Sequence, residues 1–205
     1  MEQITPPTPP LTAPHADVWA GPLFDQLLNG LLTSEAFEQQ VQASWAGPSI
    51  VFRAPDTAAR LRALGLQPGR PSAGYASDAP HLDFRSHWLA GLPGRPGAIH
   101  IQSPPEAHPG KGWAHLNRPL HQHDSARMAL ITRGQATFLV QRPGKNGHAH
   151  LQALPVQEGD LLVWPAWTAH TFDAGQGFWL VTAMARYVSP TAEGFLFPAD
   201  VDPRP

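Results

Sequence analysis

The chain contains no cysteine among its 205 residues. This absence excludes disulfide bonds, metal sites built on thiolates and cysteine nucleophiles. It does not by itself fix the cellular compartment.

Long apolar segments and an excess of positive charge are also absent. No stretch approaches the length of a membrane span, and the opening MEQITPPTPP lacks the basic and apolar regions of a signal peptide. The net charge of −2 provides no basic face for nucleic acid or an anionic membrane. We therefore expect a cytoplasmic protein that binds a small molecule and neither nucleic acid nor membrane.

The composition is that of a globular protein with proline-rich ends. Hydrophobic residues make up 42% of the chain, and its length suits one domain, or one domain with an appended subdomain, around a buried core. Many of the 24 prolines lie near the termini. We predict that residues 1–16 are a disordered, proline-rich tail and that residues 191–205 are a C-terminal tail.

Residues 17–97 read as a helical segment followed by a linker. A helical period runs from about residue 22 to 66, with Thr33 or Ser34 as the cap of one helix and Pro55 at the start of another. Residues 67–98 are rich in glycine, proline, serine and alanine, and they predict a linker with only a short helix or turn around HLDFRSHWLAG.

From about residue 98 the sequence changes to short β-like runs separated by turns. PGKNG at 143–147 is a hairpin signal between two of these runs. Eight strands at this spacing predict a closed or nearly closed antiparallel structure. The runs are AIHIQ, GWAHLNRPLHQH, ARMALITRG, ATFLVQR, AHLQALPV, DLLVWP, AHTFDA and FWLVTAMARYV.

Three histidines in this region are candidate metal ligands. His121 and His123 are two residues apart, so on a strand both imidazoles leave the same face. His170, at the start of a later strand, is the best candidate for a third ligand. A second pair, His148 and His150, has no partner at a comparable spacing and predicts a solvated strand face.

The two segments around these histidines resemble the motifs of the cupin superfamily. The first motif, G-x5-H-x-H-x3–4-E-x6-G, matches at His121, His123 and Gly134, with Arg127 at the glutamate position and His115 at the leading glycine. The second motif, G-x5-P-x-G-x2-H-x3-N, matches at three positions. These are Gly159, Pro165 and His170, whereas Trp167 and Ala174 stand at its inner glycine and its asparagine.

The resemblance covers about residues 98–190 and implies a mainly β fold. It implies a cupin-type jelly-roll barrel (a double-stranded β-helix), here preceded by a small α-helical N-terminal part. It also implies a divalent metal held by His121, His123 and His170, with iron(II) the most frequent ion in the family. Zinc, manganese, nickel and copper also suit imidazole ligands. A homodimer is a common cupin arrangement and is expected here.

Arg127 stands where the motif has an acidic ligand. Its charge at about 5 Å from a dication would cost about 6–7 kcal/mol at an effective dielectric of 20. Three interpretations stay open: the guanidinium anchors a substrate carboxylate, it pairs with a structural acid, or the metal is weak or absent.

Three further residues are candidates for roles at the site. Trp167 lies on the turn before His170 and is placed to overhang the site mouth as a substrate-binding residue. Tyr187 could supply a phenol to the cavity, as tyrosines do in some cupin lyases. His115, six residues before His121, is a candidate second-shell group or catalytic base.

Three neutral histidines leave open coordination positions, as expected of a catalytic metal site. We therefore expect an iron(II) dioxygenase that acts on a small carboxylate-bearing or chelating substrate. The first alternative is a metal-dependent lyase or isomerase that uses the ion as a Lewis acid. The second is a non-enzymatic cupin that binds a small molecule.

Overall fold

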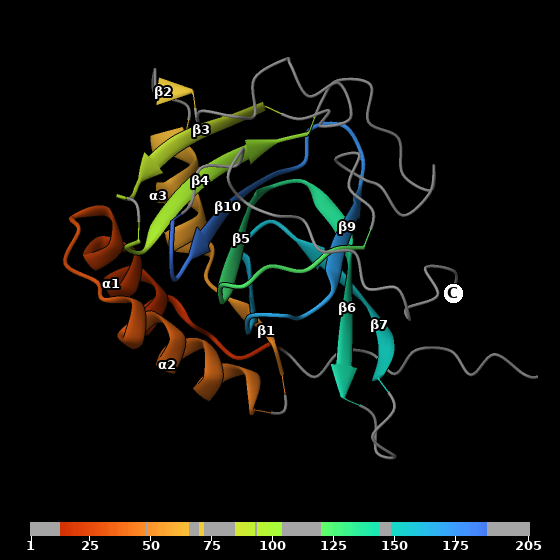
Figure 1. Cartoon of the computed structure of the whole chain (residues 1–205). Coiled ribbons are helices and arrows are strands. Elements are labelled where there is room, and N and C mark those ends of the chain that lie inside the picture. Colours follow the sequence, from red (N-terminus) through yellow and green to blue (C-terminus); the bar gives the residue numbers. More distant parts are fainter. Residues whose placement is uncertain are drawn as a thin grey trace, which may run out of the picture.

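The computed structural model describes residues 13–47, 49–65, 70–71, 85–92, 94–103, 120–143 and 149–187. Three helices precede most of the strands (Figure 1). In chain order the elements are α1 (Asp17–Leu28), α2 (Ser34–Trp45), β1 (Val51–Arg53), α3 (Pro55–Gly65), β2 (Arg70–Pro71), β3 (Arg85–Ala90), β4 (Gly97–Gln102), β5 (Arg127–Arg133), β6 (Gln135–Pro143), β7 (Ala149–Gln157), β8 (Asp160–Trp164), β9 (His170–Ala174) and β10 (Trp179–Met184).

The strands form two antiparallel sheets. The larger has the order β1-β8-β5-β10-β4-β3-β2, and the smaller has the order β7-β6-β9. A backbone bridge between His121 and His170 adds a further short pairing beside β9. A jelly roll consists of two facing sheets of four strands each. Here one sheet contains β4-β10-β5-β8, and the other consists of β7-β6-β9 and the short bridge at His121. The predicted mainly β, cupin-type barrel with a small N-terminal helical part is therefore confirmed.

The helices cover the side of the large sheet that faces away from the small sheet (Figure 1). Helix α2 begins as its sequence predicts, because the Thr33 side chain accepts a hydrogen bond from the Ala36 N–H at 3.2 Å. Its buried residues Phe37 and Val41 are four apart, so they form one apolar stripe. Helix α2 contacts β8 and helix α3 contacts β5. This side of the sheet is thus a mainly apolar core, with the buried His100 against Gly65 of α3 as a polar exception.

Two glycines of the cupin-like motifs make the tight turns of the barrel. Gly134 joins β5 to β6 with φ +79°, and Gly159 joins β7 to β8 with φ +87°. A Cβ atom on Gly134 would lie 3.0 Å from the Gly177 carbonyl oxygen. Both positions need glycine because L side chains rarely adopt this left-handed backbone.

The N-terminal segment contributes strands that its sequence does not predict. The predicted short helix or turn around HLDFRSHWLAG is wrong, since residues 85–90 form β3 and pair with β4. Strand β1 pairs with β8, and His15 bridges to Arg53 of β1, so the predicted tail ends before residue 16. Strands of two to six residues contain too few positions to show a clear alternation.

Several predicted features lie outside the described residues. They are residues 1–12, the PGKNG hairpin loop from 144 onward, residues 112–119 of the predicted second strand, and the C-terminal tail at 191–205.

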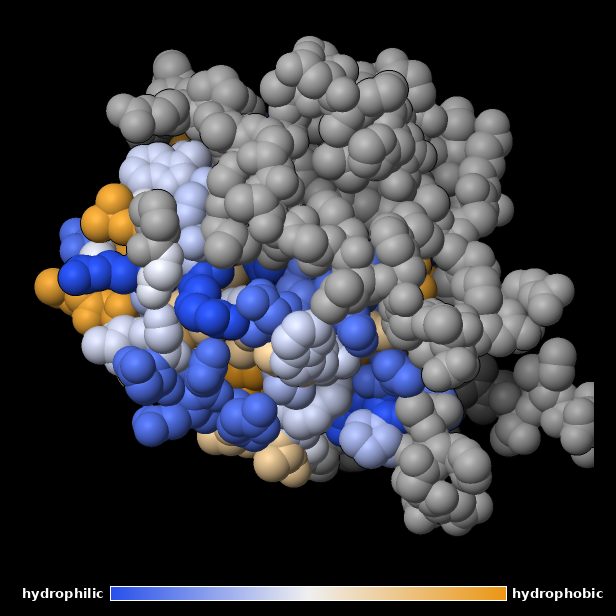
Figure 2. Space-filling view, in the orientation of Figure 1, coloured by the Kyte–Doolittle hydropathy of each residue, from blue (hydrophilic) through white to orange (hydrophobic). Residues whose placement is uncertain are grey.

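The visible described surface is mostly polar, with small hydrophobic patches near the edge where α1 lies (Figure 2). The large exposed apolar side chains include Val18, Leu31 and Leu92. None of the helices in the described ranges has the length and apolar character needed to cross a membrane.

Candidate metal centre

The fold brings the three predicted histidines together in the barrel interior. His121 and His170 pair through their backbones, with N···O distances of 3.1 and 2.8 Å in the two directions. His123 lies two residues further along the same segment. All three side chains are buried, and one potential ligand atom of each lies within 4.8 Å of the other two.

The geometry of this group fits a divalent transition metal. Imidazole nitrogens bind such ions at about 2.0–2.1 Å, so two ligands of one ion lie at most about 4.2 Å apart, close to the spacing of this group. The Nδ1 atom of His170 lies 2.8 Å from the Thr168 carbonyl oxygen. Donation from Nδ1–H to this carbonyl fixes the tautomer in which Nε2 is the ligand atom.

The segments that bear the histidines are tied to each other. The Trp167 N–H donates to the His123 carbonyl at 2.7 Å, which links the turn before His170 to the first histidine pair. The two motifs are far apart in the sequence, and these backbone hydrogen bonds hold them in contact.

Aromatic side chains form one wall of the site. The ring centroid of Trp164 lies 4.5 Å from that of His170, and Phe138 lies 5.1 Å from Trp164. Phe138 also packs on Phe172 at 4.8 Å. Electrostatic interactions are stronger in apolar surroundings of this kind.

Arg127 points into the barrel and not toward the helices. It lies opposite Trp164 in the β5–β8 register, so both side chains leave the same face of the sheet. The residue is only 3% exposed, and its Nη1 atom lies 3.1 Å from the Met184 Sδ atom. A positive charge is therefore buried on the face of the sheet that also carries the aromatic neighbour of His170.

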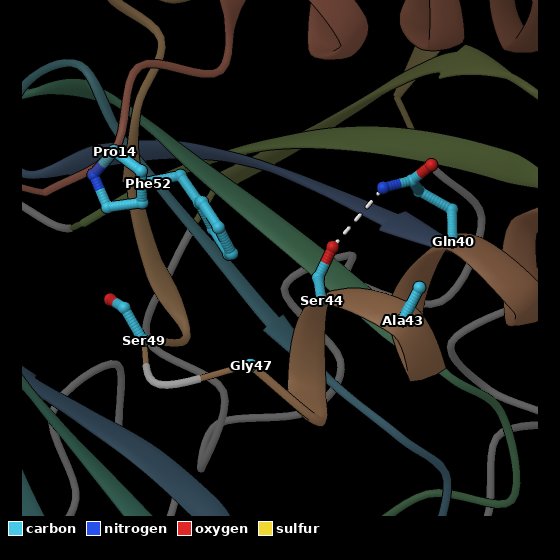
Figure 3. A pocket seen from close by; sticks show the side chains of 7 residues that line it. All are labelled: Pro14, Gln40, Ala43, Ser44, Gly47, Ser49 and Phe52. Carbon is cyan, nitrogen blue, oxygen red and sulfur yellow. Dashed lines mark hydrogen bonds between the residues drawn. The ribbon is translucent and has the colours of Figure 1, made fainter.

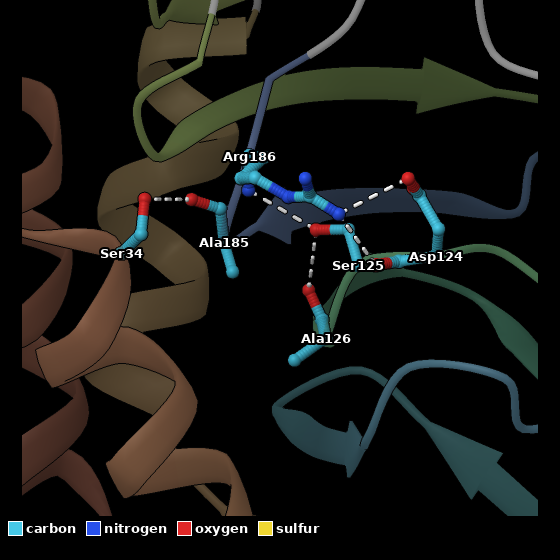
Figure 4. A network of polar contacts seen from close by, with 6 residues as sticks. All are labelled: Ser34, Asp124, Ser125, Ala126, Ala185 and Arg186. Carbon is cyan, nitrogen blue, oxygen red and sulfur yellow. Dashed lines mark hydrogen bonds and ion pairs between the residues drawn. The ribbon is translucent and has the colours of Figure 1, made fainter.

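A polar network supports the segment between His123 and Arg127 (Figure 4). Arg186 donates from Nη2 to the Asp124 carbonyl at 2.9 Å and to the Asp124 carboxylate at 3.0 Å. The Arg186 N–H donates to the Ser125 hydroxyl at 3.0 Å, and the Ser34 hydroxyl donates to the Ala185 carbonyl at 2.7 Å. The end of β10 and the start of α2 thus hold the histidine-bearing segment.

The other predicted site residues have different surroundings. Trp167 is 56% exposed beside the histidine segments. Tyr187 packs against Gly91 and Gly97 at the β3–β4 connection, and burial raises the pKa of its phenol. His150 is exposed, as predicted, whereas His115 and His148 lie outside the described residues.

Sequence reasoning did not find the Arg186–Asp124 pair or the role of Trp164 as the neighbour of His170. The pair joins residues 62 positions apart, so no local spacing signals it. Trp164 stands directly before the motif residue Pro165 and reads as an ordinary apolar strand residue. Only its place in the sheet brings it to the site.

A pocket of about 280 Å³ lies elsewhere, between α2 and β1 (Figure 3). Within it the Gln40 side chain donates to the Ser44 hydroxyl at 3.2 Å. None of its lining residues carries an ionisable side chain, so we assign it no chemistry. They are Pro14, Gln40, Ala43, Ser44, Gly47, Ser49 and Phe52.

Comparisons with known proteins find similarity only at the level of structure. No protein-family model matches the sequence, and no curated protein matches it. A variant of oxalate decarboxylase from Bacillus subtilis is 17% identical, with 56% of this chain and 28% of that chain covered and a TM-score of 0.40. The formate complex of oxalate decarboxylase from Lactobacillus farciminis is 17% identical, with 52% and 30% covered and a TM-score of 0.38.

A third similar structure is a conserved protein of unknown function from Streptococcus pyogenes. It is 16% identical, with 52% of this chain and 77% of that chain covered and a TM-score of 0.38. The chain spans less than a third of the oxalate decarboxylases that it matches. Similarity this distant does not assign a function.

The strand order and the histidine group together define the class of protein. The chain has a cupin-type jelly-roll barrel with a possible metal site formed by His121, His123 and His170.

Proposed function

We propose that this protein is a metal-dependent cupin enzyme whose ion is held by His121, His123 and His170. The observation that carries the proposal is the convergence of these three buried histidines in the barrel. Three imidazoles that meet in this way can each give one nitrogen ligand to a single divalent ion. Iron(II) is the proposed ion because of the cupin resemblance, since imidazole ligands alone also suit zinc, copper and nickel.

The proposed activity is that of a dioxygenase on a small substrate with a carboxylate or another chelating oxygen. Bound iron(II) would supply the redox chemistry that this reaction needs. Three protein ligands leave positions for substrate, and the aromatic wall around Trp164 keeps water from the reacting groups.

The charge of the site supports an anionic substrate. Three neutral imidazoles compensate none of the charge of a dication, so an anionic group is the ligand that best completes the site. We propose that Arg127 binds a substrate carboxylate through its planar guanidinium. Trp167 at the rim and Tyr187 are proposed to contact the substrate, and His115 is the proposed base.

A lyase or isomerase is the second candidate function. The same ligand set favours it, because neutral ligands leave the full dication charge to polarise a substrate carbonyl. The two candidates differ in their need for oxygen.

Elemental analysis of the purified protein, together with oxygen-electrode assays, tests these proposals. We expect one divalent ion per chain in the wild type and in His150→Ala, a control on the exposed face of β7. We expect loss of the ion in His121→Ala, His123→Ala and His170→Ala. Substrate turnover that continues without oxygen would overturn the dioxygenase and support the lyase. A protein without bound metal whose ligand binding survives all three substitutions would instead be a non-enzymatic binding cupin.

We also propose that the protein forms a homodimer. The exposed apolar residues Val18 and Leu31, at the two ends of the α1 region, are available for such a contact. Sedimentation analysis of the full chain tests this proposal, and a monomer at micromolar concentration would contradict it.

A further inference from the structure

The indole of Trp164 carries a buried hydrogen-bond donor that the described part of the chain does not satisfy. Its Nε1 atom is inaccessible to solvent and has no hydrogen-bond partner there. The whole residue is 3% exposed. Buried tryptophans usually find a partner for this N–H, and an unmade hydrogen bond in the interior is destabilising.

Packing does not account for a tryptophan at this position. The ring lies among Phe138, Phe172 and His170, with centroid separations of 5.1, 6.4 and 4.5 Å. A phenylalanine would make apolar contacts of the same kind without bringing a buried donor. The N–H group is therefore the feature that distinguishes tryptophan here.

The indole ring of Trp164 lies beside the candidate metal centre. Its ring contacts His170, which is one of the three possible ligands. Across the β5–β8 pairing it lies directly opposite Arg127, and both side chains leave the same face of the sheet. Neighbouring strands thus bring a cationic side chain beside the tryptophan that contacts His170.

We propose that Trp164 Nε1–H and Arg127 form a binding site for one acidic oxygen group of the substrate, beside the metal. The matching ligand group is a carboxylate, because it offers two acceptor oxygens and a negative charge. This inference rests on the proposed metal-dependent function and adds to it the residue that orients the substrate. Trp164 contacts the substrate and is not a metal ligand.

The test uses the full-length chain loaded with Co(II), and acetate as the probe. Trp164→Phe removes the donor and keeps an aromatic ring, and Trp19→Phe makes the same chemical change in the helical layer. We expect Trp164→Phe to bind acetate about tenfold more weakly, with Co(II) affinity within twofold of wild type. We expect its melting temperature to be unchanged or higher, because a buried unsatisfied donor has been removed. Trp19→Phe should bind acetate as the wild type does.

Proton–nitrogen correlation spectra give a direct readout of the donor. The wild type has seven tryptophans, and the cross-peak missing from Trp164→Phe identifies Trp164. Acetate should shift this indole cross-peak downfield in diamagnetic Zn(II)-loaded protein and leave that of Trp19 in place.

An unshifted Trp164 cross-peak, or equal acetate affinity in Trp164→Phe and wild type, would overturn the proposal. A lower melting temperature with loss of Co(II) would also overturn it, because Trp164 would then serve packing alone. A different result would contradict the proposed metal-dependent function, namely a wild-type protein that binds no stoichiometric metal. The acetate-induced shift in metal-free protein would then still decide whether Trp164 binds a carboxylate.

Discussion

The two faces of the large sheet differ in what is buried there. The outer face packs against the helices through apolar residues such as Phe37 and Leu61. The inner face, near the ends of β5 and β8, carries Arg127 beside the aromatic neighbour of His170. Apolar burial stabilises the fold directly, whereas burial of imidazole and guanidinium groups is costly. We therefore expect the outer face to contribute mainly to stability and the inner face, near Arg127, to contribute mainly to binding.

The largest expected effect is on the outer face. Phe37→Ala removes a fully buried ring from α2 and should lower the free energy of unfolding by about 3–5 kcal/mol. Urea denaturation measures this change. The exposed Val18→Ala is the control, with an expected change within about 0.5 kcal/mol. Under native conditions Phe37→Ala should keep its metal affinity, and a large loss of affinity would show that the two faces are coupled.

The inner face should respond in the opposite way to loss of Arg127. Arg127→Met keeps a long side chain and removes the charge, so we expect metal affinity to rise at least tenfold, or about 1.4 kcal/mol. Acetate affinity should fall in the same variant. Competition with a chromophoric chelator measures the metal affinity. An unchanged affinity would mean that an acidic partner already neutralises Arg127, which is the structural interpretation of this residue.

Trp167 affects both the stability of the fold and the proposed binding of substrate. Among the described residues it is the one non-glycine with a positive φ, at 63°, and it occupies the glycine position of the cupin motif. Left-handed backbone is unfavourable for a side chain with a Cβ atom. Trp167→Gly should therefore raise the free energy of unfolding by about 0.5–1 kcal/mol while weakening substrate binding. Thermal denaturation checks the first effect, and a fall in stability would show that the exposed indole supports the fold.

Asp17, which joins α1 to α3, gives the helical layer a pH dependence. Burial raises the pKa of its carboxyl, but hydrogen bonds from the Thr57 hydroxyl and the Thr57 and Asp56 N–H groups bring it below the ordinary value of 3.8. The carboxylate therefore stabilises the fold above that pH, and this contribution disappears as the pH falls through the lowered pKa. Asp17→Asn should cost about 1 kcal/mol at pH 7 and progressively less in acid. Denaturation at several pH values checks this, and a constant difference would contradict it.

The smallest expected effect concerns the support of the inner site. Arg186→Gln breaks the exposed pair with Asp124, so stability should fall by less than about 1 kcal/mol. Metal affinity should fall about threefold, because the segment after His123 is held less firmly, and Arg186→Lys should restore part of it. Arg60→Gln is a matched control, since its pair with Asp25 is similarly exposed, at 43% and 53% against 49% and 53%. Equal metal affinity in Arg186→Gln and Arg60→Gln would contradict a positioning role.

The parts of the fold that the sequence predicts are those with a repeated local pattern. Helix α2 follows from Thr33 and its apolar stripe, and the barrel strands follow from apolar runs separated by turns. Strands β1 and β3 carry no such pattern and become visible only through pairing with β8 and β4.

The candidate site also contains residues that a local sequence pattern predicts and residues that no local pattern predicts. The spacing of His121 and His123 signals a shared face, and the motif spacing signals His170. Arg186 and Trp164 carry no local signal, because their roles depend on residues distant in the sequence.

The sequence by itself predicted antiparallel strands and a histidine pair on one face, since periodicity, turn signals and histidine spacing are local properties. The cupin-type barrel and its set of three ligands followed from the resemblance of two segments to the cupin motifs. The tertiary structure alone decided the direction of Arg127. Its register opposite Trp164 places both side chains on the inner face, and pairing between strands is a non-local interaction that no single segment specifies.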